Sequence, residues 1–443
     1  MSREVAVTSA PVLAADPLGL FADAGLSRGG DHGLRLGGLS LEAIARDVGT
    51  PAYVYHAASI RDRYRKLSRA FEAMPHRIHY AVKSNSNLAI LTLLREAGAG
   101  ADIVSGGELQ RVLTTGFDPR AIVFSGVGKS EAELQAAIDA GIGSINLESV
   151  EELGLLERLV AGRALANPVR VGIRVNPDVG VETHPYISTG ARGIKFGVAG
   201  ELVPVLARRI AANPRLRLVT LAFHLGSQLL DPSPIVGGAQ RLVGLLGGLR
   251  AEGIRSVEAL DVGGGLGVGY RDGDVVDPGP FASRLLPVIG GLDVTLHLEP
   301  GRYLTASCGV LLTQVLFRKH SGGKDFVVVD AAMNDLVRPS HYQAYHEIVE
   351  VRARGRPVRR VDVVGPVCET GDFLALDRAV AEVERGDYLA VLGAGSYGFV
   401  MASNYNSRPR PPEVLIDRGR YGIVRRRETV GDLLAAETPD PFT

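Results

Sequence analysis

The residue with the clearest chemical potential is a lysine at the end of an apolar run. Lys83 closes the segment Ile78–Lys83, and polar turn residues follow it. Burying an ammonium group is costly unless another group compensates its charge. An amine can lose that charge by condensing with a carbonyl cofactor to form a Schiff base. The alternative is a side chain that leaves the strand end and reaches water.

The scarcity of lysine narrows the choice of a Schiff-base residue. Lys66 lies in a charged helical stretch, and Lys319 and Lys324 flank a Ser-Gly-Gly turn. Lys195 lies in a loop between two glycines, where a surface role is expected. The six lysines of the chain are Lys66, Lys83, Lys129, Lys195, Lys319 and Lys324.

Lys129 lies in a segment that resembles the end of a phosphate-binding P-loop. Ser125–Ser130 follows a predicted strand and opens a predicted helix. The full motif requires a glycine five residues before Gly128, and this chain has Val123 there. A P-loop nucleotide-binding protein therefore stays a weakened rival, which measurable ATP affinity would support.

Three further groups follow predicted strands in the same way. They are His224-Leu-Gly-Ser-Gln228, the glycine-rich run Gly263–Gly267, and Glu299-Pro-Gly-Arg302. Taken singly, each has an ordinary explanation: a core histidine, a flexible turn, or turn chemistry. The glycine run is no dinucleotide fingerprint, because Val268 stands where that motif needs glycine. Its backbone N–H groups can still cradle one phosphate.

The elements that must position these groups alternate between apolar strands and amphipathic helices. That pattern predicts a parallel sheet covered by helices, and eight such units predict an α/β fold of the closed (β/α)₈ TIM-barrel type. Catalytic groups in such barrels lie at the carboxyl ends of the strands. Pro51–His56 is a ninth candidate strand, which we assign to the barrel's rim or to a second domain. The eight predicted barrel strands are Ile78–Lys83, Ala101–Ser105, Ala121–Gly126, Ser144–Glu148, Val169–Asn176, Val219–Gly226, Ala259–Gly264 and Thr295–Glu299.

The pattern changes after Gly301. Short β-rich segments follow with little helix between them, which predicts an antiparallel β-domain, a barrel or a sandwich. We therefore predict three parts. Residues 1–48 form an N-terminal extension that packs partly on the β-domain, residues 49–302 form the barrel, and residues 303–443 form the β-domain with a terminal helix.

Composition excludes several classes of protein. The 443 residues are 46% hydrophobic and carry a formal net charge of zero, so a basic nucleic-acid-binding surface is not expected. Neither a secretory signal nor an apolar run long enough to span a membrane is visible, so we expect a cytoplasmic protein with no membrane contact. The two cysteines, Cys308 and Cys368, lack metal-ligand spacing, and we expect no metal.

Seven motifs, taken in order, resemble those of the fold-type III pyridoxal-phosphate decarboxylases, and within them the group that acts on diaminopimelate. The likeness runs from about Gly38 to the C-terminal helix and implies an alanine-racemase-like barrel followed by a β-domain. The motifs are Tyr80–Asn85, His224–Gln228, Gly263–Gly267, Glu299–Arg302, Met333–Pro339, Gly365–Asp372 and Met401–Pro409.

The resemblance implies a role for each residue around the cofactor, pyridoxal 5'-phosphate. Lys83 would hold it covalently, His224 would stack on the pyridine face, and Glu299 would pair with the ring nitrogen. The phosphate would be held by Ser227, Gly263, Gly264, Gly265, Gly267, Gly301, Arg302 and Tyr397.

The resemblance also implies how the substrate is held. Arg302, Arg338 and Tyr342 would bind the distal carboxylate of meso-2,6-diaminopimelate, and Glu369 its distal amine, with Tyr397 nearby. The family completes its site in a homodimer, where Cys368 and Glu369 reach in from the partner subunit. Cys368 would act there as a general acid.

The expected reaction is the decarboxylation of meso-2,6-diaminopimelate to L-lysine, a step of lysine biosynthesis. Ser340 and His341 before Tyr342, and Ser396 before Tyr397, depart from the smaller residues usual in the family. They leave open a related decarboxylase that acts on ornithine, arginine or a carrier-bound amino acid. A non-catalytic pyridoxal-phosphate carrier is the other rival, and the large β-domain weighs against it.

Overall fold

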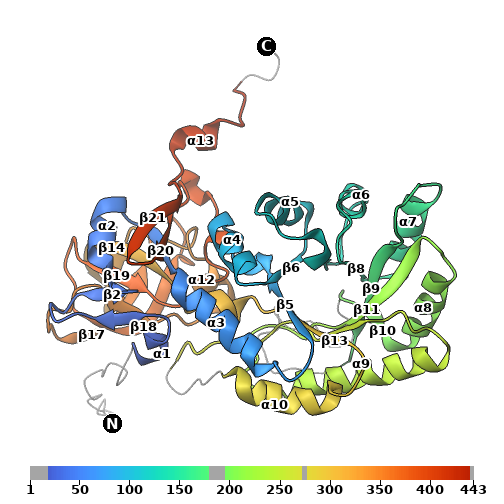
Figure 1. Cartoon of the computed structure of the whole chain (residues 1–443). Helices are drawn as coiled ribbons and strands as arrows, with labels where there is room; N and C mark the ends of the chain where they lie inside the picture. The colour runs from blue at the N-terminus through green and yellow to red at the C-terminus, as the bar shows by residue number, and fades with distance from the viewer. Residues whose placement is uncertain (1–17, 179–194, 272–276, 440–443) are drawn as a thin grey trace, which may run out of the picture. The chain divides into compact units, whose positions relative to one another are not determined.

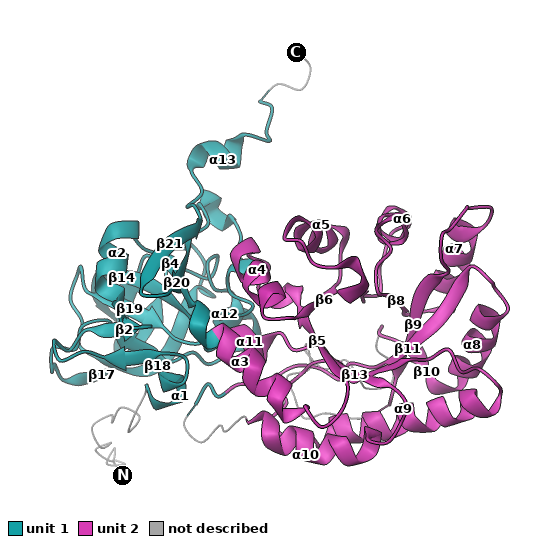
Figure 2. Ribbon diagram, in the orientation of Figure 1, with its two compact units in different colours: residues 1–59, 269–273, 307–443 teal, residues 60–268, 274–306 magenta. Residues whose placement is uncertain are grey.

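The computed structural model describes residues 18–178, 195–271 and 277–439 and divides into two compact units (Figure 1, Figure 2). The barrel unit comprises residues 60–268 and 274–306. The β-rich unit comprises residues 1–59, 269–273 and 307–443. The predicted domain boundaries remain a prediction, and each unit is described by itself below.

Eight parallel strands close into a barrel, as predicted. Each strand pairs with the next in chain order, and β13 pairs with β5 to close the ring. A ninth short strand, β10 (Val198–Ala199), pairs in parallel with the end of β9. The barrel strands are β5 (His76–Ala81), β6 (Gly100–Ile103), β7 (Ile122–Phe124), β8 (Ser144–Leu147), β9 (Val169–Asn176), β11 (Leu216–Ala222), β12 (Ala259–Asp261) and β13 (Thr295–Leu298).

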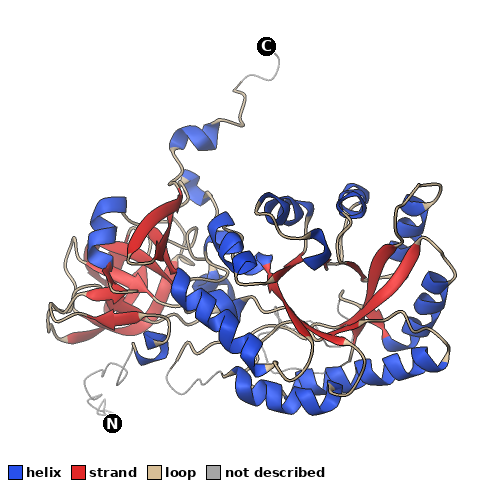
Figure 3. Ribbon diagram, in the orientation of Figure 1, coloured by secondary structure: helices blue, strands red, loops and turns tan. Residues whose placement is uncertain are grey.

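Helices follow the strands and surround the barrel (Figure 3). Several begin at a side-chain cap in the loop after a strand: Ser105, Ser130 and Ser149 each accept a hydrogen bond from a backbone N–H of the first turn. Such caps satisfy donors that the helix itself leaves unpaired. The helices are α3 (Ala57–Ala70), α4 (Leu88–Glu96), α5 (Gly106–Thr114), α6 (Glu131–Ala140), α7 (Val150–Val160), α8 (Val203–Ala211), α9 (Ser233–Ala251), α10 (Pro278–Ile289) and α11 (Arg302–Thr305).

The β-rich unit is built on one long strand, β14 (Gly309–Ser321), which pairs antiparallel with three others. One of them is β4 (Ala52–His56), the surplus strand of the sequence, so its place is in this sheet and not in the barrel. Most pairings are antiparallel, but β15–β17 and β20–β4 are parallel. The other strands are β15 (Lys324–Val329), β16 (Ile348–Glu350), β17 (Val358–Val364), β18 (Phe373–Ala381), β19 (Tyr388–Val391), β20 (Glu413–Asp417) and β21 (Arg420–Arg425).

Residues near the start of the described chain share the core of this unit. Phe21, Leu36 and Ile44 are buried in one cluster with Leu312 and Ala390 of the sheet. Residues 1–17 of the predicted N-terminal extension lie outside the described residues. The remaining elements are α1 (Gly19–Ala22), β1 (Leu26–Arg28), β2 (Leu34–Leu36), β3 (Leu39–Ser40), α2 (Leu41–Val48), α12 (Arg338–Tyr342) and α13 (Val430–Leu434).

Across the described ranges, no helix combines the length and the apolar character needed to cross a bilayer.

Candidate active site

A cavity of about 380 Å³ opens at the carboxyl ends of the barrel strands. This volume lies in the usual range of small-ligand sites. Lys83, His224 and Glu299 all line it, although they are far apart in sequence. The barrel therefore brings together the three strand-end groups that the sequence analysis singled out.

Lys83 stands just beyond its strand. β5 ends at Ala81, two residues earlier than predicted, and Lys83 lies in the 3₁₀ turn Val82–Ser84 that follows. Its Nζ donates to Oδ2 of Asp102 at 2.5 Å. The Asp102 side chain is fully buried on β6, while about a third of the Lys83 side chain is exposed. The ammonium is thus compensated by a carboxylate and still faces the cavity.

The sequence analysis missed Asp102. A carboxylate inside the otherwise apolar run Gly100–Ile103 was the signal that could have revealed it, because buried charges are paired or coordinate a ligand. The sequence analysis also missed Arg174, another charged residue within a barrel strand. It lies on β9, lines the cavity, and donates to Glu148 Oε1 at 2.7 Å.

Glu299 follows β13 and is buried. Burial, together with the charges of Asp102 and Asp261, raises the pKa of Glu299 well above its ordinary value. Burial likewise raises the pKa of Asp261 to about 7. Among the described residues, Oε1 of Glu299 has no hydrogen-bond partner. Glu299 therefore holds a proton readily and presents an unsatisfied polar atom.

His224 is neutral and fixed in orientation. Its Nδ1 accepts a hydrogen bond from the backbone N–H of Gly264 at 3.1 Å, so the ring proton of the neutral form is on Nε2. Burial lowers the pKa of His224 well below its usual value, and the charge of Lys83 adds to this effect. A neutral ring held in this way offers a flat face for an aromatic ligand.

The glycine-rich loop needs its glycines. Gly263 and Gly265 have φ values of +70° and +101°, where side chains are disfavoured. A Cβ on Gly264 would lie 2.1 Å from the carbonyl oxygen of Glu299. Asp261 Oδ1 accepts from the Gly263 N–H at 2.8 Å and holds the turn. The loop therefore lies against both His224 and Glu299.

Ser227 and Arg302 also meet in the barrel unit. Nε and Nη2 of Arg302 donate to Oγ of Ser227 at 3.1 and 3.0 Å. Gly301 precedes Arg302, and a Cβ there would lie 2.9 Å from Cβ of Ser84, next to Lys83. A hydroxyl, a guanidinium and a tight backbone turn are thus gathered on the segment that follows Glu299.

The other predicted site residues lie in the β-rich unit. Arg338 is buried and donates to Tyr270 Oη at 3.2 Å and to His346 Nε2 at 2.8 Å. His346 Nδ1 lies 2.8 Å from the carbonyl oxygen of Leu392, so Nδ1 carries the proton and Nε2 accepts. The sequence analysis missed His346, which gives Arg338 a fixed direction.

The thiol of Cys368, in a loop of this unit, is exposed. Cys368 lies between β17 and β18, and its backbone N–H donates to Asn406 Oδ1 at 3.0 Å. Glu369 hydrogen-bonds through its side chain to Tyr405. Tyr342 ends α12, and Tyr397 adopts a positive φ of 53°. A positive φ in a tyrosine is uncommon and is often found at functional sites.

Comparison with known proteins places the site in a family. Residues 57–306 match the family described as pyridoxal-dependent decarboxylase, pyridoxal binding domain. The chain belongs to the pyridoxal-dependent decarboxylases. It is 49% identical to the diaminopimelate decarboxylase of Pseudomonas aeruginosa over 90% of this chain and 96% of that protein.

Solved structures of other pyridoxal-dependent decarboxylases agree with this assignment. The diaminopimelate decarboxylase of Helicobacter pylori complexed with L-lysine is similar with a TM-score of 0.85 and 40% identity, over 89% of this chain and 98% of that one. The enzyme of M. jannaschii in co-complex with L-lysine gives a TM-score of 0.88 and 34% identity, over 94% and 98%.

The residues present fit the cofactor of this decarboxylase family. The unpaired Oε1 of buried Glu299 can face a ring nitrogen, and the amine of Lys83 faces the same cavity. The N–H groups of Gly263 and Gly264 are held by Asp261 and His224, so what this loop offers a phosphate is a close backbone approach without side chains. Pyridoxal phosphate needs these three features together.

Lys129 has a structural position at the edge of this cavity. Its Nζ donates to Glu152 Oε1 at 2.6 Å and to the carbonyl oxygens of Gly126 and Asn146, both at 2.8 Å. The side chain is only 1% exposed. The amine is therefore saturated by protein acceptors and ties two strand-end loops together.

We expect Lys129→Met to lower the free energy of unfolding by about 3–5 kcal/mol, because Glu152 would be left buried without its partner. Adding Glu152→Gln to Lys129→Met should recover part of this loss. Urea denaturation of the holoenzyme followed by circular dichroism measures both.

The matched control is Lys66→Met, which removes an exposed lysine paired with Asp62 at 3.6 Å. Its effect should stay within about 1 kcal/mol, as is usual for surface ion pairs. Equal losses in the two lysine variants would contradict the structural role of Lys129.

Proposed function

We propose that this chain, with pyridoxal 5'-phosphate as cofactor, removes CO₂ from meso-2,6-diaminopimelate and releases L-lysine. The observation that carries the proposal is the cavity that joins Lys83, His224 and Glu299 in a chain 49% identical to a diaminopimelate decarboxylase. The Helicobacter pylori enzyme of this kind is complexed with L-lysine, the product that the proposal requires.

The bound cofactor supplies an electron-poor ring that accepts the electrons left when CO₂ departs. We assign Lys83 to its covalent attachment. Asp102, at 2.5 Å from Nζ, keeps the amine directed into the cavity. It also provides a carboxylate that can accept or return the proton that Lys83 must lose to act as a nucleophile.

Glu299 and His224 would set the electronics and position of the ring. The raised pKa of Glu299 makes this carboxyl group a proton carrier opposite the ring nitrogen, so a positive charge can be kept there. Neutral His224, held by the Gly264 N–H, would cover one ring face without adding charge. The remaining cofactor contacts assigned here, all to the phosphate, are Ser227, Gly263, Gly264, Gly265, Gly267, Gly301, Arg302 and Tyr397.

Substrate recognition would depend on two arginines. Diaminopimelate carries a second carboxylate at its far end, and guanidinium groups bind carboxylates with directional hydrogen bonds. Arg302 and Arg338 are assigned to that group with Tyr342, while Glu369 is assigned to the distal amine, near Tyr397. The bond from Arg338 to His346 supports a fixed orientation of this guanidinium. Decarboxylases of simple diamines would have no use for such a pair.

We further propose a cytoplasmic homodimer in which Cys368 and Glu369 of the partner subunit complete each site. The exposure of Cys368 supports this assignment, since a proton donor must reach its acceptor directly. The thiol would deliver a proton to the substrate's α-carbon once the carboxylate has left.

Lys83→Ala should abolish the visible absorbance of the covalently held cofactor, because no other lysine can take its place in the cavity. Spectra of protein purified with added pyridoxal phosphate measure this. Lys66→Ala is the matched control, since Lys66 is exposed on α3 and pairs with the partly exposed Asp62. Retained absorbance in Lys83→Ala would remove this residue from the site.

Cys368→Ala should bind the cofactor normally and lower kcat by roughly 100-fold or more, which is the usual loss when a general acid is removed. Steady-state CO₂ release measures this loss. Cys308→Ala removes the buried cysteine and should leave kcat nearly unchanged. Unchanged turnover in Cys368→Ala would exclude the thiol from proton transfer.

Mixing the two inactive variants tests whether the site is shared between subunits. A heterodimer of Lys83→Ala and Cys368→Ala chains contains one site with both residues intact, so about a quarter of the wild-type activity should return after subunit exchange. No recovery, with heterodimers demonstrated by mass spectrometry, would show that each chain supplies its own Cys368.

The holoenzyme should release CO₂ from meso-diaminopimelate with a kcat/KM at least about 100-fold above that for ornithine, arginine or lysine, because those substrates leave the carboxylate-binding groups unpaired. A coupled CO₂ assay across the four amino acids measures this. Equal or better turnover of ornithine would instead favour a related decarboxylase with a different substrate.

A further inference from the structure

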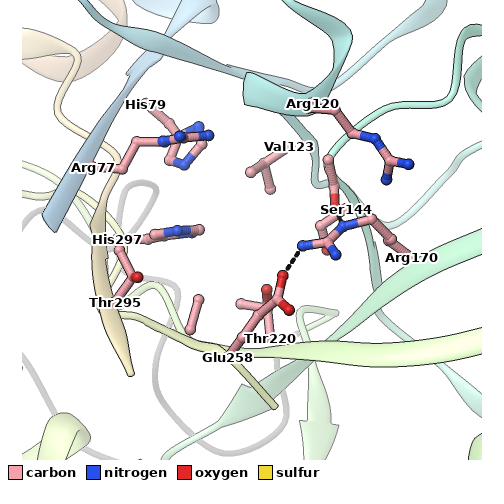
Figure 4. A pocket seen from close by; sticks show the side chains of 12 residues that line it. Arg77, His79, Arg120, Val123, Ser144, Arg170, Thr220, Glu258, Thr295 and His297 are labelled. Atoms are coloured by element: carbon pink, nitrogen blue, oxygen red, sulfur yellow. Dashed lines mark hydrogen bonds and ion pairs between the residues drawn. The ribbon is translucent and has the colours of Figure 1, made fainter. Parts of the chain in front are cut away.

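A second cavity lies at the opposite, amino-terminal end of the barrel strands. Its volume is about 420 Å³, within the range of small-ligand sites. Residues that begin the strands line it, including Arg77 and His79 of β5, and Thr295 and His297 of β13 (Figure 4). None of them lines the cavity around Lys83.

Small side chains leave this space open. Barrels of this kind usually fill their interior with layers of valine, isoleucine and leucine. Here Gly143, Ser144, Thr220 and Ala259 stand at lining positions instead. A Cβ on Gly143 would lie 2.4 Å from the carbonyl oxygen of Arg120, so no larger residue fits there. The cavity thus follows from the choice of residues on several strands.

A buried acceptor without a partner faces this space. His79 is 1% exposed, and its Nδ1 lies 3.1 Å from the carbonyl oxygen of Ala121, so Nδ1 carries the proton. Burial lowers the pKa of His79 to about 3, which keeps the ring neutral. Nε2 is therefore a bare acceptor, and it has no partner among the described residues. Such an atom is costly to leave unsatisfied.

A second histidine, His297, lies beside His79. The ring of His297 lies 4.6 Å from that of His79, centroid to centroid, and its Nδ1 also lacks a partner within the described ranges. Burial lowers the pKa of His297 well below its ordinary value. Figure 4 shows both rings, with Arg77, on one wall of the cavity.

Arginines give the cavity a positive surplus. Arg170 already has partners in the protein, because it donates to the Gly143 carbonyl at 2.8 Å and pairs with Glu258. Glu258 also pairs with Arg217 at 3.2 Å. The negative charge of Glu258 is therefore balanced by Arg170 and Arg217. Arg77 and Arg120, on opposite walls in Figure 4, have no carboxylate partner within the described part of the chain.

We propose that this amino-terminal cavity binds a small phosphate monoester that carries hydroxyl groups. The phosphate oxygens would accept hydrogen bonds from Arg77 and Arg120, and a ligand O–H would donate to Nε2 of His79. A neutral polyol would leave the guanidinium groups without an anion. An anion with no hydroxyl would leave Nε2 of His79 unpaired.

Glycerol 3-phosphate is the probe, titrated into the holoenzyme by isothermal calorimetry. In the holoenzyme the phosphate subsite of the catalytic cavity is already filled, so binding reports on a different place. We expect saturable binding of glycerol phosphate, weaker binding of propyl phosphate, which has no hydroxyls on its chain, and no binding of glycerol. Absence of glycerol phosphate binding, or equal affinity for propyl phosphate, would overturn the proposal.

Variants locate the binding. Arg77→Gln and Arg120→Gln each change an exposed side chain and should weaken glycerol phosphate binding by about tenfold, the usual loss for a hydrogen bond to a charged group. Arg241→Gln is the matched control: it removes one exposed positive charge on α9 and lies outside the cavity. Equal weakening in all three variants would show nonspecific charge attraction and refute the site. Decarboxylase activity should stay unchanged in each of them.

Discussion

The burial of several carboxyl groups within one barrel is the constraint on which the active site depends. Burial raises the pKa of both Asp261 and Glu299, and the nearby charge of Asp102 raises both further. Lys83 compensates Asp102 directly, while Glu299 and Asp261 relieve the remaining repulsion by holding protons at higher pH than usual. The same arrangement would supply the two things that a pyridoxal decarboxylase requires: a directed amine, and a carboxyl group that can give its proton to the ring nitrogen and then pair with it as a carboxylate.

Polar residues at both ends of the barrel follow from strand alternation. Side chains two residues apart point to the same face of a strand. On β5 Arg77, His79 and Ala81 share a face, and Lys83 follows in the 3₁₀ turn beyond the strand. On β13 Thr295 and His297 share a face, and Glu299 follows directly after the strand. One end of each stretch lines the amino-terminal cavity and the other end lines the catalytic cavity. The fold thus presents two polar surfaces from one set of strands.

Much of the barrel and its catalytic rim was predictable, because the signals are local. Lys83, His224 and Glu299 were identified by their positions after apolar runs, and strand–helix alternation predicted eight parallel strands. In the P-loop-like segment, the amine of Lys129 is taken up by protein acceptors. The sequence left Pro51–His56 between the barrel's rim and a second domain, and only the pairing of β4 with β14 decides for the second.

The sequence by itself determined the alternation of strands and helices, the polar residues at strand ends and the family resemblance. Each of these depends on residue types at short spacing along the chain. Only the tertiary structure decided which groups meet. Asp102 lies 19 positions from Lys83, and His346 becomes meaningful only through its bond to Arg338. Likewise, the missing partner of Nε2 of His79 becomes visible only once the ring is buried in the folded barrel. Burial and charge pairing are properties of the closed ring, and no short stretch of sequence contains them.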